Sequence, residues 1–416
     1  MLFRLFTKCL LLLVSLSVSL SSQANNEQFD ERDIRILQSL SLSALPPLPD
    51  TPSNNVADHK LAVEFGRQVF YDSRFGKDGQ LSCASCHQPE LAFTDGKQRG
   101  KGVGEAARNT PTLIGAAYQR WFYWDGRRDS LWSQALIPFE APDEMGSSRL
   151  SVLRVINNDK RYRSYYEALF GGLPKLDFSK LPDEASPYGA SDIQNNWYRL
   201  SRPTQTTINR AFSNIGKVLE AFQRTLLPEP SKFDHFVDAL TAGQQDKALS
   251  MVSESQILGA KLFIDQEKTQ CLQCHNGPML TNGGFHNIGS GVFSGPNMDY
   301  GRVFGLQSVL MDEFNCLGKY SDAAPSECTD LKYLSRDKHQ GLQGAFKVPT
   351  LRFLDKTGPY FHDGRFDQLK DVMDYYRSPP EKGLNGQHEL RTLDITLEER
   401  DALVDFLGLL SVPAEH

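Results

Sequence analysis

The pentapeptide CASCH at residues 83–87 is followed by a second of the same pattern, CLQCH at residues 271–275. Two cysteines separated by two residues and followed by histidine are the attachment signature of a c-type haem, in which the cysteines form thioethers and the histidine ligates iron. One such motif can also be a structural cysteine pair or half of a zinc site, whereas two in one chain make chance a poor explanation. The sequence therefore predicts two covalent haem c groups, held by Cys83, Cys86 and His87 and by Cys271, Cys274 and His275.

The composition is that of a globular chain. Its 416 residues, 40% hydrophobic and 23% charged, suffice for two domains with their own cores, and a formal net charge of −6 does not suggest a nucleic-acid partner. Residues 1–24 have the features of an export signal: Arg4 and Lys8, an apolar run over residues 10–20, and small residues ending at Ala24. The run is too short to cross a bilayer, so we expect a periplasmic protein whose mature chain has no membrane span.

Similar segments recur in the same order along the chain. FGRQVFYD (residues 65–72) and LGAKLFID (residues 258–265) precede the two haem motifs, each with apolar residues at helical spacing around a glycine. TPTL (residues 110–113) matches VPTL (residues 348–351), and thirteen residues after each proline comes a matching turn, WDGR or HDGR. We predict an all-α fold of two tandem class I cytochrome c-like haem domains that arose by internal duplication.

The duplication predicts which residue faces each iron opposite its histidine. Fourteen residues beyond the histidine of HDGR lies Tyr376, in a helical stretch, and a phenolate is an acceptable haem ligand. Met373, one helical turn earlier, is the alternative ligand. Fourteen residues beyond the tryptophan of WDGR lies Pro138, whose side chain has no donor. We therefore expect a catalytic domain with an open haem at residues 25–245 and an electron-transfer domain at residues 246–416.

An open haem needs acid-base groups nearby if it is to cleave peroxide. Gln134, Glu140 and Glu144 occupy the segment around Pro138. A carboxylate can move a proton from one peroxide oxygen to the other, typically contributing about 10²–10⁴-fold to the rate. An arbitrary glutamate is more often a solvated surface charge, so we expect this role for one of the two glutamates only.

The ordered motifs resemble those of the bacterial dihaem cytochrome c peroxidases and their MauG-like relatives. The resemblance covers roughly residues 60–410 and rests on CxxCH, RNTPT, WDGR, Gln, Pro and Glu, then a second CxxCH with NGPMLTNGGFHNIG, KVPTLR and TGPYFHDGR. It implies that Glu144 is the distal catalytic carboxylate, that Gln134 lies beside the open iron, and that Trp124 relays electrons between the haems. It also implies one calcium ion between the domains, an ion that prefers oxygen ligands, here the Asn109 side chain and the carbonyls of Thr357 and Pro359.

The chain departs from the ordinary peroxidase pattern in two places. Those enzymes usually have a methionine where Tyr376 stands, and a histidine about sixteen residues after the first CxxCH that blocks the catalytic haem until reduction. The matching loop here, residues 88–109, contains no histidine. Both differences look like the MauG-like members, whose tyrosine-ligated haem helps to store oxidising equivalents while a partner protein is modified at a distance.

The sequence therefore predicts an exported dihaem peroxidase that uses hydrogen peroxide, with either a small redox protein as electron donor or a specific protein as substrate. An electron-transfer cytochrome without its own substrate is the alternative, and it would need two closed irons. Oxygenase-type oxidation of a partner at the open haem is a third possibility. Residues 146–201 and 315–340 are long for a minimal haem domain and are candidates for partner specificity. Cys316 and Cys328 are expected to form a disulfide in an oxidising compartment.

Overall fold

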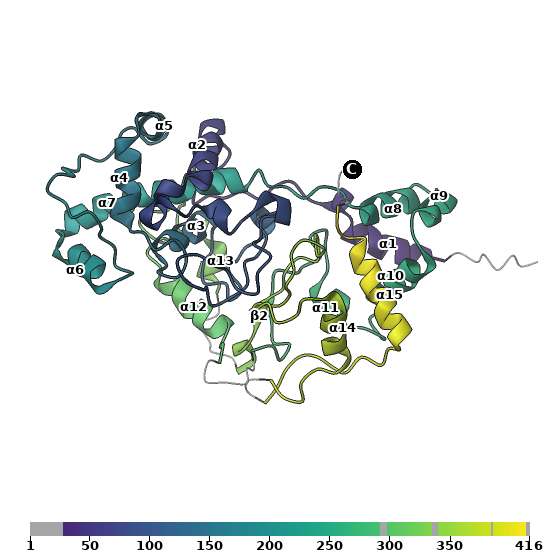
Figure 1. Ribbon diagram of the computed structural model, residues 1–416. Helices are drawn as coiled ribbons and strands as arrows, with labels where there is room; N and C mark the ends of the chain where they lie inside the picture. Colours follow the sequence, from purple (N-terminus) through teal and green to yellow (C-terminus); the bar gives the residue numbers. More distant parts are fainter. Residues whose placement is uncertain (1–27, 292–297, 335–339, 384–385, 413–416) are drawn as a thin grey trace, which may run out of the picture.

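The computed structural model describes residues 28–291, 298–334, 340–383 and 386–412 (Figure 1). Helices dominate these ranges, and their regular strands are limited to β1 (Phe285–His286) and β2 (Phe346–Lys347), which pair antiparallel. The mostly helical fold agrees with the predicted all-α class. The α-helices are α1 (Glu31–Leu40), α2 (Lys60–Tyr71), α3 (Leu131–Glu140), α4 (Arg149–Asn158), α5 (Lys160–Phe170), α6 (Ser191–Arg199), α7 (Arg202–Gln223), α8 (Lys232–Thr241), α9 (Gln245–Ser250), α10 (Glu254–Ile264), α11 (Cys271–Cys274), α12 (Arg302–Met311), α13 (Thr329–Lys332), α14 (Leu369–Arg377) and α15 (Leu397–Gly408).

Two large hydrophobic cores hold the chain together. One is built on α2, α3, α4 and α7, and the other on α10 and α15 with α1 and α8. Figure 1 shows these two groups of helices at opposite sides of the molecule. The cores do not follow chain order, because α1 packs into the second core and Phe314 and Tyr320 pack into the first. The predicted division of the chain at residue 245 stays a prediction.

In each core, a glycine lies at a close contact between two helices. A Cβ atom built on Gly66 of α2 would lie 1.8 Å from the carbonyl oxygen of Val218 in α7. One built on Gly259 of α10 would lie 1.9 Å from the carbonyl oxygen of Ala402 in α15. The helices approach too closely for any side chain, so packing requires glycine at both positions. These are the glycines around which the two repeated helical segments were matched.

The WDGR and HDGR turns have the same local geometry. The residue just before the tryptophan has a φ of 66°, and the one just before the histidine has a φ of 71°. Such angles are uncommon for bulky residues. An isolated antiparallel bridge closes each turn, Phe122 with Arg128 and Tyr360 with Phe366. Both residues of the second bridge lie 238 residues after those of the first (360 − 122 and 366 − 128). Two positions separated by this offset are called equivalent.

Cys316 and Cys328 form the expected disulfide, with an S–S distance of 2.03 Å. Among the residues that the structure describes, no helix has both the length and the apolarity to cross a bilayer. The predicted export signal at residues 1–24 lies outside the described residues.

Candidate active site

A cavity of about 1170 Å³ lies between the two halves and is lined by residues of both haem motifs. Cys86 and His87 of the first motif contribute, as do all three motif residues of the second. Cys83 lines a smaller cavity of about 60 Å³, which shares Cys86 and His87 with the large one. None of the four motif cysteines forms a disulfide, so all four are available for thioether bonds. The cavity and its thiols therefore suit two covalently attached haems.

Both motif histidines are oriented by a hydrogen bond from Nδ1 to a backbone carbonyl oxygen. His87 Nδ1 lies 2.8 Å from the carbonyl oxygen of Phe93, and His275 Nδ1 lies 3.0 Å from that of Leu280. A carbonyl oxygen only accepts, so each Nδ1 carries the proton and each Nε2 is left as a metal ligand. Burial lowers the pKa of His87 and lowers the pKa of His275 to about 4, which keeps both rings neutral. The two carbonyl partners were not predicted from the sequence, since they lie in loops at slightly different distances from their motifs.

Gln134, Pro138 and Glu144 lie together, since all three line both cavities with His87. The Oε1 atom of Gln134 is buried and has no hydrogen-bond partner in the part of the chain that the structure describes. A buried acceptor without a partner costs about 1–3 kcal/mol, so such an atom is expected where a ligand or water binds. Burial also raises the pKa of the Glu144 carboxyl. This wall of the cavity thus combines a polar acceptor and a proton-exchanging group with a residue that offers iron no donor.

Tyr123 compensates for the proline inside α3. Proline lacks the N–H that would bond to the carbonyl four residues earlier, which here belongs to Gln134. The Tyr123 hydroxyl donates to that carbonyl oxygen at 3.1 Å. The Arg127 guanidinium lies over the Tyr123 ring, 3.5 Å from its centroid. Tyr123 was not predicted as a site residue, although its position directly before WDGR was a usable signal.

The equivalent helix of the second half, α14, brings two candidate ligands to the cavity. Tyr376 and Met373 both line it, and Met373 is 6% exposed. Burial, followed by the nearby thiols of Cys271 and Cys274, raises the pKa of the Tyr376 phenol. A phenolate ligand therefore requires iron itself to displace the phenol proton. Because both side chains reach the same cavity, the choice of Tyr376 over Met373 stays a prediction.

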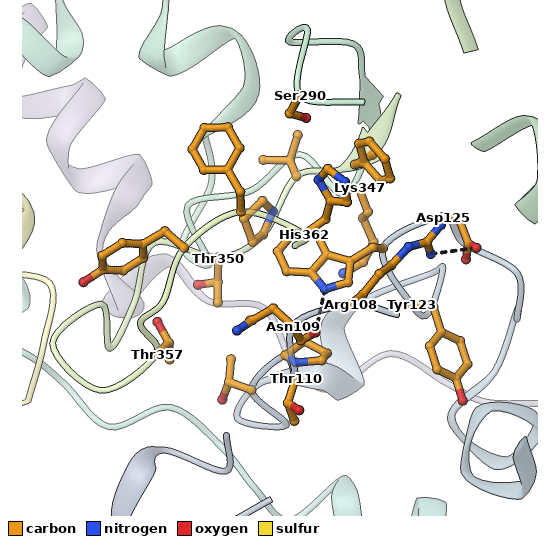
Figure 2. Close-up of a pocket in the computed structure, with 18 of the residues that line it drawn as sticks. Arg108, Asn109, Thr110, Tyr123, Asp125, Ser290, Lys347, Thr350, Thr357 and His362 are labelled. Atoms are coloured by element: carbon orange, nitrogen blue, oxygen red, sulfur yellow. Dashed lines mark hydrogen bonds and ion pairs between the residues drawn. The ribbon is translucent and has the colours of Figure 1, made fainter. Parts of the chain in front are cut away.

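Two crossed backbone hydrogen bonds join the halves at Trp124 and His362. The Asn109 amide donates to the His362 carbonyl at 2.9 Å, and the Lys347 amide donates to the Trp124 carbonyl at 2.7 Å. The Trp124 indole N–H donates to the Asn109 carbonyl at 3.0 Å, and its ring meets His362 edge-on with 6.5 Å between centroids (Figure 2). Trp124 thus lies in a wall that both haem motifs share, which is where a relay between them would be needed.

A buried ion-pair network that the sequence analysis missed borders this junction. Arg108 lies 2.8 Å from Asp125 (Figure 2). It also lies 2.8 Å from Asp299, so one guanidinium links the two halves. The guanidinium carbon of Arg108, Cζ, also lies 5.6 Å from the centroid of the Phe346 ring. The Phe346 ring in turn stacks on His362. The partners of Arg108 come from distant segments, and no local pattern indicates them.

The three residues assigned to calcium all line the cavity. Asn109 Nδ2 donates to the Lys97 carbonyl at 2.9 Å, which leaves Oδ1 available to a cation. Figure 2 shows both Asn109 and Thr357 among the residues around the cavity. Over the described ranges, no group of three or more His, Cys, Asp or Glu side chains is arranged to hold a metal ion. The predicted site, completed by the Pro359 carbonyl, would therefore bind calcium through neutral oxygens, and it stays a prediction.

Glu140 differs from the expected surface charge. It is 3% exposed, and its Oε1 atom accepts hydrogen bonds from Arg149 Nε at 2.7 Å and from the Ser186 hydroxyl. Arg149 also pairs with Glu313 at 2.6 Å. Glu140 lines neither cavity. Its carboxylate belongs to a buried structural network, and breaking such a pair costs about 3–5 kcal/mol.

Comparison with known proteins identifies the class of protein that this chain resembles. A family model described as di-haem cytochrome c peroxidase matches residues 60–242, which include the first CxxCH, the WDGR turn and α3. The chain is therefore similar to the di-haem cytochrome c peroxidases over this region. The methylamine utilization protein MauG of Methylorubrum extorquens is 29% identical over 87% of this chain and 81% of its own length. The cytochrome-c peroxidase IdrP1 of a Pseudomonas species is 26% identical over 97% of this chain and 91% of its own.

Solved structures share the fold. The diheme peroxidase BthA from Burkholderia thailandensis superposes with a TM-score of 0.60 and 18% identity, covering 85% of this chain and 86% of BthA. A MauG-like protein associated with microbial copper homeostasis gives a TM-score of 0.59 and 24% identity, covering 88% of this chain and 95% of its own. These similarities support the predicted class of enzyme, a dihaem peroxidase-type oxidoreductase, and with it two haem c groups.

Proposed function

We propose that this protein is an exported, periplasmic peroxidase that reduces hydrogen peroxide at an open haem held by His87, while a second haem, ligated by His275 and Tyr376, transfers or stores oxidising equivalents. The observation that carries the proposal is the contrast between equivalent helices. Beside His87, α3 brings Pro138 and Gln134 to the cavity wall. Beside His275, α14 brings Tyr376.

The chemistry divides between cofactor and protein. The haem, when bound, supplies the iron that takes up peroxide and the electrons that reduce it. A Glu144 carboxylate oxygen accepts the proton from one peroxide oxygen and returns it to the other, which leaves as water. Overall, hydrogen peroxide, two electrons and two protons give two water molecules. Gln134, with its buried unpaired acceptor, orients the peroxide O–H, and burial brings the pKa of Glu144 closer to neutrality, where proton exchange in both directions is efficient.

The junction between the two halves contains the residues proposed to transfer electrons between the haems and to bind calcium. Trp124 would carry electrons or holes between the haems, since it shares a cavity wall with both CxxCH motifs. The recurrence of bridged turns at one constant offset, together with a close glycine crossing in each half, supports an origin by tandem duplication. A calcium ion on Asn109, Thr357 and Pro359 would tie the halves together at this junction, as the family resemblance implies.

The reductant is either a small redox protein or a protein side chain that becomes oxidised. A tyrosine-ligated haem and a loop at residues 88–109 without histidine favour the second, because both suit a resting enzyme that meets peroxide before any electron donor. Residues 146–201 remain candidates for partner specificity.

The deciding experiment is electron paramagnetic resonance of the ferric holoprotein, followed by stopped-flow mixing with peroxide. We expect one high-spin and one low-spin haem, and a reaction without prior reduction. Two low-spin haems that are inert to peroxide would instead identify an electron-transfer cytochrome. A ferric protein that reacts only after one-electron reduction would mean that an unrecognised residue blocks the first haem.

A further inference from the structure

The offset of 238 residues gives the predicted calcium site a counterpart in the other half of the molecule. Position 347 corresponds to position 109, so Lys347 stands where the first half has Asn109. The crossed hydrogen bonds bear this out, because the amides of these two residues donate to the equivalent carbonyls of Trp124 and His362. In the same way, the counterparts of Thr357 and Pro359 are Gln119 and Trp121.

The structure brings the counterpart residues into contact. The Lys347 ammonium donates a hydrogen bond to Gln119 Oε1. Positions 347 and 119 are the equivalents of positions 109 and 357, two of the residues assigned to calcium. One half would thus hold a calcium ion between these positions, whereas the other carries a covalently attached cation.

Among the residues that the structure describes, the Lys347 ammonium has no carboxylate counter-ion. It is half-buried and lines the cavity, and within the described ranges no carboxylate forms an ion pair with it. Burial lowers the pKa of Lys347 to about 8, with no nearby carboxylate to offset the effect. A buried ammonium is costly unless an anion pairs with it. The groups that this cavity is built to hold are haems, and each haem carries two propionate carboxylates.

We propose that the Lys347 ammonium, oriented by Gln119, binds a propionate carboxylate of one haem beside Trp124, and so serves as a built-in cation where the opposite half uses calcium. The inference rests on the two haems of the proposed function and not on peroxidase activity. A positive charge next to a haem favours the reduced iron, which carries one charge less, and therefore raises that haem's reduction potential. The charge cannot be removed by a chelator.

The test is spectroelectrochemistry of the holoprotein carrying Lys347→Met, which keeps the length of the side chain and removes its charge. We expect the reduction potential of one haem to fall, and the haem that shifts is the one whose propionate is bound. Lys347→Arg should restore the potential most of the way. The control is Lys356→Met, at an exposed lysine nearby in sequence, which should leave both potentials unchanged.

Unchanged potentials in a fully haem-loaded Lys347→Met protein would overturn the inference, as would a Lys347→Arg protein that behaves like Lys347→Met. If Lys347→Met fails to fold, Lys347→Gln compared with Lys347→Arg gives the same test, because only the second retains charge. Absence of covalent haem from the parent protein would contradict the proposed function itself. Normal haems with insensitive potentials would contradict this inference alone.

Discussion

Helices α3 and α14 occupy equivalent positions in the two halves, yet they offer the cavity opposite chemistry. Leu131 begins α3 and Leu369 begins α14, which is the same offset that relates the bridged turns. At the matching cavity position, α3 has Pro138 and α14 has Tyr376. The glycine crossings behind these helices are alike in both halves. Similar helix packing can therefore accompany different side chains at the cavity, and it is this difference that the proposed function assigns to catalysis in one half and to electron storage in the other.

The largest effect is expected from Glu144→Gln in the first half. It retains size and hydrogen-bonding shape but removes the base, so the reaction with peroxide should slow by about 10²–10⁴-fold, or ~3–5 kcal/mol of barrier. In the parent protein the active form is the carboxylate, so the rate should fall as pH drops through the pKa of Glu144, which burial raises above its ordinary value. Stopped-flow mixing over a pH series measures both effects.

The matched control is Asp143→Asn, because Asp143 is the adjacent residue, carries the same charge and is exposed. Glu140→Gln is unsuitable as a control, since it would break the buried pair with Arg149. Equal slowing by Asp143→Asn and Glu144→Gln would mean a general electrostatic effect and would remove the proton-shuttle role from Glu144.

In the second half, Tyr376→Met should raise the reduction potential of the His275 haem, because a neutral thioether replaces an anionic oxygen and no longer favours the ferric state. Spectroelectrochemistry resolves the two haems. Tyr375→Phe is the control, since the Tyr375 hydroxyl donates to the Ile288 carbonyl and the residue does not line the cavity. An unchanged potential and spectrum in Tyr376→Met would transfer the ligand assignment to Met373.

Removing calcium with a chelator tests whether a calcium ion binds at the junction of the two halves. If calcium links Asn109 to the segment with Thr357 and Pro359, its removal should lower the melting temperature and the activity, because the unfolded chain lacks the assembled ligands. At a concentration of 100 times the dissociation constant, such an ion contributes about 2.7 kcal/mol. Calorimetry and metal analysis before and after chelation measure it. Identical melting, activity and metal content would exclude the ion.

The smallest effect is expected from Tyr123→Phe, which gives the first half the aromatic residue that the second half already has at Phe361. The Gln134 carbonyl would lose the hydroxyl that replaces the missing proline N–H, at a cost of about 1 kcal/mol in the free energy of unfolding. Denaturant unfolding of the holoprotein measures this difference. An unchanged free energy of unfolding would show that water satisfies the carbonyl equally well.

The sequence was informative where function depends on local spacing. The CxxCH motifs, the equal spacing of the two turns and the contrast of Pro138 with Tyr376 could all be read directly, and the helical class followed from apolar periodicity. Glu140 was misjudged because its burial depends on Ser186 and Arg149, which approach only after folding. The entry of α1 into the second core is likewise a long-range packing event that local periodicity does not encode.

The crossed hydrogen bonds at Trp124 and His362 also constrain how such a chain can diverge. The carbonyl of each turn accepts a hydrogen bond from a backbone amide of the other half. A backbone shift in one turn would therefore remove the acceptor that this amide needs. Insertions and deletions are therefore penalised twice at these turns. The side chains that project from the turns are less constrained, so tryptophan in one turn and histidine in the other are compatible with the same backbone geometry.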